Sequence, residues 1–407
     1  MDATGPTGSP AAGGEVALPG LLRRTHVAAV SVALVAAGSA VVSGLPDGSA
    51  VPSAVAVDAP RTAESVLARM TLRQQVGQLF MIGTPATSAS PAALDAIGRR
   101  HVGNVMLTGR SYHGTATPAR VAAAMQARAT DAATDGVRLL LATDQEGGLV
   151  QVLHGPGLSE MPTALQQGRW RPARLRERAG VWARQLRHAG VNMDLAPVED
   201  TVPSASAARD NPPIGAYDRE LGYRVRVVAR HGRAFALGMS THGVVPTIKH
   251  FPGLGRVHAN TDTSAGVTDD VTTRHDPYLR PFRVSIDAGV PVVMVSLAYY
   301  RRIDPRRPAA FSPVVIGSML RGDLGFGGVV VSDDLANARQ VAGWRPGVRA
   351  VRFLGAGGDL VLTVNPSTLP AMYDAVVHRA RSHAGFRARV EAAALRVLTL
   401  KQHRGLL

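Results

Sequence analysis

The chain has 407 residues and a formal net charge of +15, carried almost entirely by arginine, because Lys249 and Lys401 are its only lysines. It contains no cysteine, which excludes disulfides, thiolate metal sites and thiol catalysis. The positive charge favours anionic surroundings such as wall polymers or lipid headgroups. It does not favour nucleic acid as a partner, because the arginines are scattered and aromatic residues make up only 4% of the chain.

The first 62 residues are typical of an export segment. Arg23 and Arg24 precede a mostly apolar run at 27–42, and small-x-small cleavage sites lie near the end of this run at 38–40 and after it at 54–56. The arginine pair hints at twin-arginine export. The apolar run is slightly short for a membrane span, so an uncleaved anchor is the weaker alternative. We therefore expect residues 1–62 to be an export signal or anchor followed by a disordered linker. The protein would then be secreted or associated with the cell envelope, with any membrane or cell-wall association made through this segment.

From residue 63 onward, short apolar runs alternate with stretches of helical pattern. The runs predict strands at 78–83, 103–109, 138–144, 191–198, 244–250, 291–298, 327–333 and 358–364. Helices are predicted between them, at 118–133, 172–189, 218–238 and 277–288.

This alternation of strands and helices predicts parallel strand pairing with right-handed crossovers. Eight such units in about 340 residues fit a (β/α)8 TIM-type barrel better than an open doubly wound sheet. No GxGxxG sequence follows the first predicted strand, which also weighs against a dinucleotide fold. We predict an α/β protein with a single catalytic barrel domain over residues 63–407, acting as a monomer.

Polar residues stand at the carboxyl ends of four predicted strands. In such a barrel these ends form one face, which carries the active site. Taken alone, each residue could be a helix cap or a solvated carboxylate. Together they predict an active site at this face, formed by Asp144, Asp194, Lys249, His250, Asp333 and Asp334.

The fifth predicted strand ends in the sequence KHFPGLG at residues 249–255. Pro252 fixes one backbone dihedral, and the glycines let the chain turn sharply and approach a ligand closely. The loop then continues to Ser264 with no helical or strand period. This motif and the loop that follows resemble the signature of family 3 glycoside hydrolases, specifically the β-N-acetylglucosaminidase branch. The resemblance covers about residues 64 to 405.

The resemblance implies a retaining glycosidase that acts on a carbohydrate, a terminal β-linked N-acetylglucosamine, without metal or cofactor. It makes Asp333 the nucleophile, while Asp144, Lys249 and His250 hydrogen-bond the hydroxyls of the terminal sugar. The strand pattern alone cannot choose between Asp333 and Asp334, and we interpret Asp334 as a cap on the next segment. Together with the export signal, the resemblance makes peptidoglycan fragments the expected substrate.

The acid/base of the family is usually a histidine in an Asp-Ser/Thr-His triplet after this motif. Here the triplet is Asp262-Thr263-Ser264, and a serine hydroxyl is too weak an acid to replace an imidazole. Asp262 and His258 lie on the same loop. We predict Asp262 as the general acid/base, carried to the sugar when the loop closes on substrate, with His258 as the reserve.

Two further departures concern sugar binding. The arginine usual after the fourth strand is Tyr217 here, and Arg219, two residues later, is predicted to bind substrate. The arginines that usually follow the Asp-Gln-Glu-Gly-Gly motif are replaced by Leu149 and Val152.

Two other functions remain open from the sequence. One is a catalytically weak, glycan-binding relative that kept the pocket and lost its acid; an aryl glycoside with a good leaving group would distinguish it. The other is a Schiff-base lyase, because a lysine at the end of a barrel strand is the aldolase arrangement. The adjacent histidine and the paired aspartates argue against the lyase, and borohydride reduction in the presence of a carbonyl substrate would test it.

Overall fold

The computed structural model of the protein describes residues 61–407. The predicted export signal and nearly all of the predicted linker therefore lie outside the described residues. Within 61–407, no helix is both long enough and apolar enough to cross a membrane.

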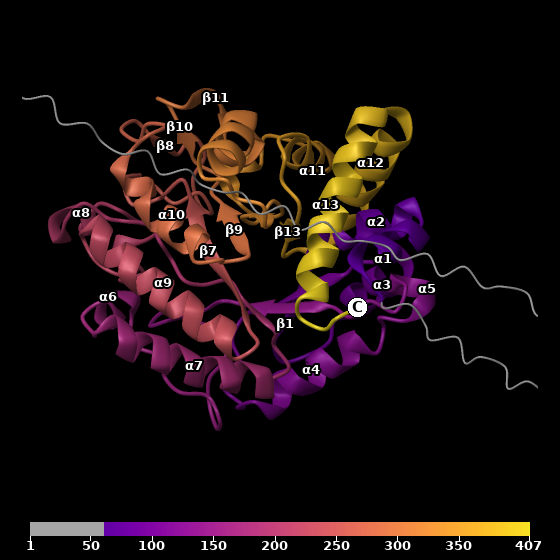
Figure 1. The fold of residues 1–407 in the computed structure, drawn as a ribbon, viewed down its shortest axis with the longest axis horizontal. Helices are drawn as coiled ribbons and strands as arrows, with labels where there is room; N and C mark the ends of the chain where they lie inside the picture. Colours follow the sequence, from indigo (N-terminus) through magenta and orange to yellow (C-terminus); the bar gives the residue numbers. More distant parts are fainter. Residues whose placement is uncertain (1–60) are drawn as a thin grey trace, which may run out of the picture. The chain divides into compact units, whose positions relative to one another are not determined.

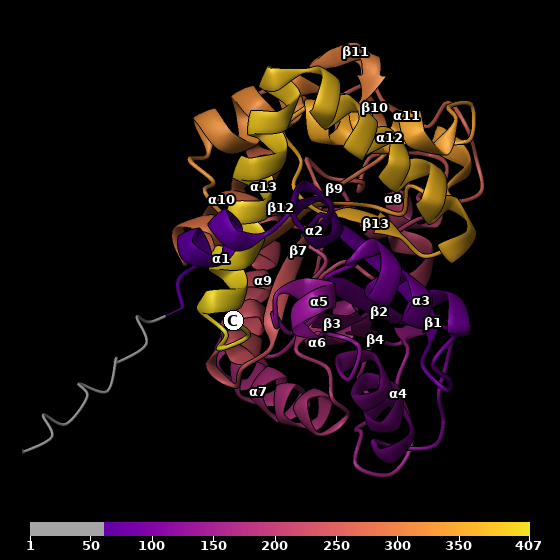
Figure 2. The same ribbon diagram turned by 90° about the vertical axis from the view of Figure 1, so that its right-hand side faces the viewer.

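Eight parallel strands form the central sheet, with helices around it (Figures 1 and 2). In spatial order it runs β12-β9-β7-β6-β3-β2-β1-β13. A parallel bridge between Val331 and Leu360 joins the two outer strands and closes the ring. The strands are β1 (Phe80–Pro85), β2 (Asn104–Thr108), β3 (Leu140–Thr143), β6 (Met193–Asp194), β7 (Val245–Phe251), β9 (Val292–Val295), β12 (Val329–Ser332) and β13 (Val361–Thr363). Each lies at one of the eight predicted positions, and the (β/α)8 barrel is confirmed.

Short irregular strands lie outside the ring. β4 (Gln145–Gly147) and β5 (Val150–Gln151) form a hairpin directly after β3. A small three-stranded sheet contains β8 (Thr268–Asp269), β10 (Tyr299–Tyr300) and β11 (Asp304–Pro308). Neither small sheet was predicted from the sequence, because runs this short carry no recognisable period.

The helices cover the outside of the ring, as Figure 2 shows for α7, α9 and α13. They are α1 (Ala63–Arg69), α2 (Leu72–Gln78), α3 (Pro91–Arg100), α4 (Ala116–Gln126), α5 (Asp131–Thr134), α6 (Ala164–Gln167), α7 (Pro172–His188), α8 (Ala205–Arg209), α9 (Val225–Thr241), α10 (Arg280–Asp287), α11 (Pro346–Gly355), α12 (Leu369–Ser382) and α13 (Ala384–Gln402). A π-helical segment, Val314–Asp323, stands before β12.

The predicted helix at 218–238 starts later than expected. Asp218 has a φ of 52° and Gly222 a φ of 147°, and neither value is compatible with a right-handed helix. Helix α9 therefore begins at Val225. The segment before it is a loop that carries Arg219 toward the centre of the barrel.

The barrel strands are apolar because both of their faces are buried. The strand β12 reads Val-Val-Val-Ser and is buried throughout, as expected for a parallel strand covered on both faces. Inside the ring, side chains such as Met81, Leu140, Met193 and Val292 pack into a common core. This packed interior leaves the loops at the carboxyl ends of the strands to form a pocket.

Candidate active site

A pocket of about 350 Å³ opens at the carboxyl ends of the strands. Apolar side chains from the strands and the residues directly after them, including Met106, Leu195, Met294 and Leu362, lie among its lining residues. Its charged or titratable lining residues are Asp144, Glu146, Arg219, Lys249, His250, Asp262, Asp333 and Asp334. Of the residues predicted for the site, Asp144, Arg219, Lys249, His250, Asp262, Asp333 and Asp334 line the pocket, whereas His258 and Asp194 do not.

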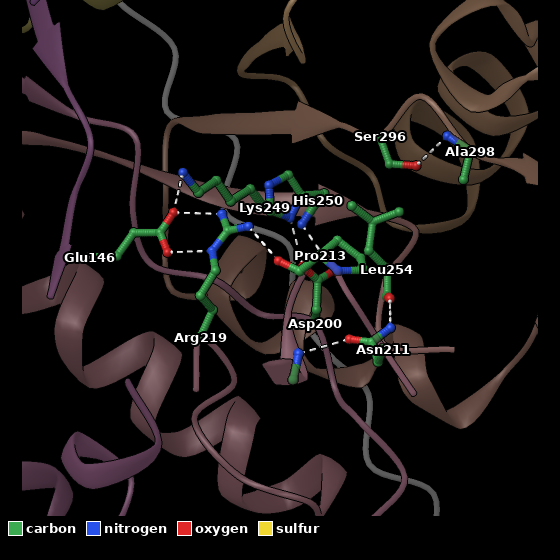
Figure 3. A network of polar contacts seen from close by, with 12 residues as sticks. Glu146, Asp200, Asn211, Pro213, Arg219, Lys249, His250, Leu254, Ser296 and Ala298 are labelled. Carbon is green, nitrogen blue, oxygen red and sulfur yellow. Dashed lines mark hydrogen bonds and ion pairs between the residues drawn. The ribbon is translucent and has the colours of Figure 1, made fainter. Parts of the chain in front are cut away.

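Lys249 is the centre of a buried ion-pair network (Figure 3). Its Nζ lies 2.6 Å from Oδ1 of Asp144 and 2.6 Å from Oε1 of Glu146, and its side chain is only 3% exposed. Arg219 reaches the same Glu146 from the loop before α9 and donates from Nε and Nη2 to its two carboxylate oxygens, each at 2.8 Å. Two cations and two carboxylates are therefore held in one fixed arrangement.

The network keeps its members charged. Burial alone would raise the pKa of Glu146, but the charges of Arg219 and Lys249 outweigh that effect and lower the pKa to about 2. Burial alone would lower the pKa of Lys249, but Asp144 and Glu146 outweigh it and raise the pKa. Lys249 is thus a protonated donor with two fixed acceptors, able to offer its remaining hydrogen to a ligand.

His250 is oriented by Asp200, a buried residue that follows β6. Oδ2 of Asp200 lies 2.6 Å from Nδ1 of His250, and Oδ1 accepts hydrogen bonds from the backbone N–H groups of His250 and Leu254 at 3.1 and 2.8 Å. Asp200 therefore fixes both the ring and the turn that follows it, as Figure 3 shows. With Nδ1 engaged, Nε2 is the nitrogen of His250 that remains for the pocket.

The two aspartates after β12 have different partners. The carboxylate of Asp334 accepts hydrogen bonds from the backbone N–H groups of Ala336, Asn337 and Val364, at 2.9, 3.1 and 3.1 Å. Among residues 61–407, the Asp333 carboxylate accepts one hydrogen bond, at Oδ1 from the neighbouring N–H of Asp334, at 2.8 Å. Asp334 therefore holds its own loop and the chain after β13, in line with the cap interpretation. Asp333 keeps a carboxylate oxygen with no partner in this described part of the chain.

Asp262 lines the pocket. Its loop is fastened to the segment after β12, where Arg339 and Gln340 donate backbone N–H groups to the carbonyls of Asp262 and Thr261, both at 3.0 Å. The residue as a whole is exposed, but its carboxyl group is partly shielded from water within the pocket. This shielding and the negative charge of Asp333 raise the pKa of the carboxyl to about 6.

Three other residues considered in the sequence analysis lie elsewhere. His258 is exposed, and its Nδ1 lies 3.2 Å from the carbonyl of Asp210; it is not among the pocket residues. Ser264 does not line the pocket either. Asp194 is fully buried beneath it and accepts a hydrogen bond from the N–H of Gln145 at 3.0 Å, and burial raises its pKa well above the usual value.

Glu146 and Asp200 were not singled out from the sequence. Each had a signal: Glu146 stands two residues after Asp144, so an extended chain points both side chains to the same side. Asp200 ends the polar sequence that follows the fourth predicted strand. Neither signal reveals that the carboxylate pairs with a basic residue from another loop.

Within residues 61–407, no group of three or more His, Asp or Glu side chains is arranged to hold a metal ion. Two of the pocket carboxylates are paired with cations: Asp144 with Lys249, and Glu146 with both Lys249 and Arg219. A closed (β/α)8 barrel with a carboxyl-lined pocket at the carboxyl ends of its strands is the architecture of many barrel enzymes, and barrel glycosidases are one class that uses such carboxyl groups.

The family follows from a comparison with known proteins. Residues 71–400 match the model of the glycosyl hydrolase family 3 N-terminal domain. The chain therefore belongs to glycoside hydrolase family 3, as the sequence motif at 249–255 indicated.

Individual relatives agree with this assignment. A β-N-acetylhexosaminidase from Beutenbergia cavernae DSM 12333, known as a crystal structure, is 52% identical; the match covers 82% of this chain and 99% of that one, with a TM-score of 0.82. A family 3 β-N-acetylglucosaminidase from Paenibacillus sp. str. FPU-7 is 34% identical, covering 83% of this chain and 63% of that one, with a TM-score of 0.76. A β-hexosaminidase from Xylella fastidiosa (strain M23) is 35% identical over 311 residues, or 74% of this chain and 88% of that protein.

Proposed function

We propose that the protein is a retaining β-N-acetylhexosaminidase that releases terminal β-linked N-acetylglucosamine, with Asp333 as nucleophile and Asp262 as general acid/base. The observation that carries the proposal is that both carboxyl groups line the same pocket. Shielding from water and the charge of Asp333 raise the pKa of Asp262 to about 6, which suits a proton donor. A retaining glycosidase needs a division between a proton donor and an ionised nucleophile.

In the first half of the reaction, a carboxylate oxygen of Asp333 attacks the anomeric carbon. The glycosidic bond breaks, and the protonated carboxyl of Asp262 gives its proton to the departing oxygen. The sugar is then joined to Asp333 as an ester. The aglycone leaves as a neutral alcohol.

In the second half, Asp262 acts as a base. Its carboxylate takes a proton from water, and the water oxygen attacks the anomeric carbon and displaces Asp333. The product is N-acetylglucosamine with its original anomeric configuration. Asp262 ends protonated and Asp333 ionised, as both began.

The ion-pair network supplies recognition of the sugar. The carboxylate of Asp144 can accept from hydroxyl groups, while Lys249, Arg219 and His250 donate to or orient the same ring. Because Glu146 holds Lys249 and Arg219 in place, these donors are preorganised and lose little side-chain freedom when the sugar binds.

The same network argues against the Schiff-base lyase. A lysine that attacks a carbonyl must be neutral, and enzymes reach that state by lowering the pKa of the amine. Asp144 and Glu146 instead raise the pKa of Lys249. The amine is therefore held protonated and unable to act as a nucleophile.

We further propose that the sugar comes from peptidoglycan fragments and that the protein acts outside the cytoplasm. Support for this location comes from the sequence at 1–62, where a basic flank precedes an apolar run and small-x-small sites lie near its end and after it. The test is to compare the protein with and without this segment expressed in its natural host, with cell fractionation as the readout. Recovery of the full-length chain only in the cytoplasm would contradict the proposal.

The activity itself is tested with aryl β-N-acetylglucosaminides and, as the natural type, a fragment in which N-acetylglucosamine is joined to N-acetylmuramic acid. We expect release of N-acetylglucosamine from both, and NMR should show the β anomer first. Release of the α anomer first would contradict retention. If even an activated aryl glycoside survives while N-acetylglucosamine binds, the chain is a glycan-binding relative.

A further inference from the structure

Helices α7 and α9 lie side by side on the outside of the barrel (Figures 1 and 2). They pack closely: a Cβ placed on Gly238 of α9 would come within 2.3 Å of the backbone oxygen of Arg176 in α7. Each helix has 17 residues. Their outer sides therefore form one continuous surface.

The two helices carry seven exposed arginines. Arg174 lies over the ring of Trp170. The other six, which we call the arginine face, are Arg176, Arg184 and Arg187 of α7 and Arg226, Arg230 and Arg233 of α9. The sequence of α9 contains no Asp or Glu, and that of α7 contains only Glu177. The face is thus almost purely cationic.

None of these six arginines forms an ion pair with another residue in the described range 61–407. Elsewhere, arginines do have such partners: Arg321 and Arg396 both reach Asp359, and Arg274 reaches Asp323. The arginine face has unused capacity to bind an anion.

The arrangement on α9 is unfavourable within the protein itself. Arg226, Arg230 and Arg233 stand at i, i+4 and i+7, so their side chains project from one side of the helix and repel one another. A ligand with several negative charges would relieve this repulsion. One with a single charge would relieve only part of it.

The geometry points to a base-free, single-chain polymer of phosphate diesters, of the poly(glycerol phosphate) type, as the ligand. Arg226 and Arg233 are about 10 Å apart along the axis of α9. Gly238 lies level with Arg176 and His242 with Gly180, so the three arginines of α9 precede Arg176 along the helix pair, while Arg184 and Arg187 follow it. The face thus presents cations one after another along the two helices. A guanidinium group binds phosphate through two parallel hydrogen bonds, which suits a chain of regularly spaced phosphates.

The same face is poorly suited to a lipid bilayer or to stacked bases. The exposed large apolar residues of the described chain are Tyr112, Leu149, Tyr217, Val271 and Val348, and none lies on α7 or α9. A membrane-surface helix needs an apolar side to insert, and single-stranded nucleic acid is usually held by exposed aromatic rings. None of the six arginines lines the active-site pocket, so a bound polymer leaves that pocket free.

The test measures binding of the full-length protein to fluorescent poly(glycerol phosphate) at several salt concentrations. The first variant combines Arg226→Gln, Arg230→Gln and Arg233→Gln. A second combines Arg176→Gln, Arg184→Gln and Arg187→Gln, which keeps the test decisive if the first does not fold. The matched control changes Arg379, Arg381 and Arg389 to Gln; these are also exposed, lack ion pairs in the described chain and lie on α12 and α13.

We expect the wild-type protein and the control to bind alike, and each arginine-face variant to lose about tenfold in affinity and part of its salt dependence. Hydrolysis of a small aryl glycoside should be the same in all four proteins, so the result does not depend on the proposed activity. If the control variant loses as much affinity for the polymer, the loss reflects only the lower net charge of the protein, and the proposal is overturned. Tighter binding to phosphatidylglycerol vesicles or to duplex DNA would also overturn it.

Discussion

Glu146 and Arg219 lie 73 positions apart in the sequence and form a two-pronged ion pair, with both N···O distances at 2.8 Å. The side chain of Glu146 is 2% exposed and that of Arg219 17%. Lys249 approaches the same carboxylate at 2.6 Å. One buried glutamate therefore fixes two of the cations that line the pocket.

Glu146→Gln should disorder both cations. A glutamine keeps one acceptor oxygen but turns an NH2 group toward a guanidinium or an ammonium group, which cannot accept it. We expect kcat/KM for an aryl N-acetylglucosaminide to fall, mainly through a higher KM. The loss should correspond to about 1–3 kcal/mol of binding free energy. Steady-state kinetics and a thermal melt measure this. The matched control is Glu160→Gln, whose side chain is 74% exposed, and an equal effect in both variants would refute the positioning role.

Asp333→Asn should nearly abolish hydrolysis and leave the melting temperature close to that of the wild type. Asp334→Asn should leave part of the activity but lower the free energy of unfolding by about 1 kcal/mol. The reason is that the carboxylate of Asp334 accepts hydrogen bonds from three backbone N–H groups. A fluorinated sugar that traps the glycosyl-enzyme, followed by mass spectrometry, should label Asp333. A label on Asp334 would reverse the two roles.

The strand positions were predictable from sequence because a barrel buries each strand on both sides, which leaves an apolar run bounded by turns. All eight runs mark strands in the structure. The start of α9 was not predictable from the sequence, because the left-handed φ of Asp218 depends on tertiary contacts. These include the hydrogen bond between its carbonyl and the N–H of Leu165, which no local pattern reveals.

The site was predictable where residues stand at strand ends, since topology brings those ends together. Asp144, Lys249, His250 and Asp333 all line the pocket. Loop residues are different. His258 and Asp262 are four positions apart on one loop, yet only Asp262 reaches the pocket, because Arg339 and Gln340 anchor its backbone. That anchor joins segments far apart in sequence and is set by the fold.

Lys401 should make stability depend on pH. It is fully buried on α13, donates to Oε1 of Gln78 and the carbonyl of Gly103 at 2.7 and 2.8 Å, and its burial lowers its pKa from 10.5 to about 7. Between these values the unfolded chain binds the proton and the folded chain does not. Its contribution to the free energy of unfolding therefore rises with pH in this window, by up to about 1.4 kcal/mol per pH unit.

Lys401→Met removes this dependence. Denaturant unfolding of both proteins at several pH values between about 7 and 10 gives the difference in their stabilities. We expect it to shift in favour of the wild type as pH rises, because only the wild type gains from losing the proton. Curves that stay parallel across the window would show that Lys401 keeps its ordinary pKa when buried.

Asp262→Ala should separate substrates by their leaving groups. Glycosides with poor leaving groups need the proton of Asp262 and should lose most of their rate, while activated aryl glycosides keep the first step and accumulate the glycosyl-enzyme. Added azide should restore turnover of the activated substrates, because it attacks without needing a base. Equal loss on both kinds of substrate would refute the acid role, and His258→Ala, on the same loop but outside the pocket, is the control expected to change neither.

The pH dependence gives a second measure of the same group. The acid works only when protonated, so with a poor leaving group the kcat/KM of the wild type should fall as pH rises through about 6, the pKa of Asp262 in the free enzyme. Asp333→Asn removes the negative charge that helps to raise this pKa, so NMR titration of Asp262 in that variant should give a lower value. In Asp262→Ala the fall in rate near pH 6 should disappear. If that fall persists unchanged, another group titrates there, and Asp262 is not the acid.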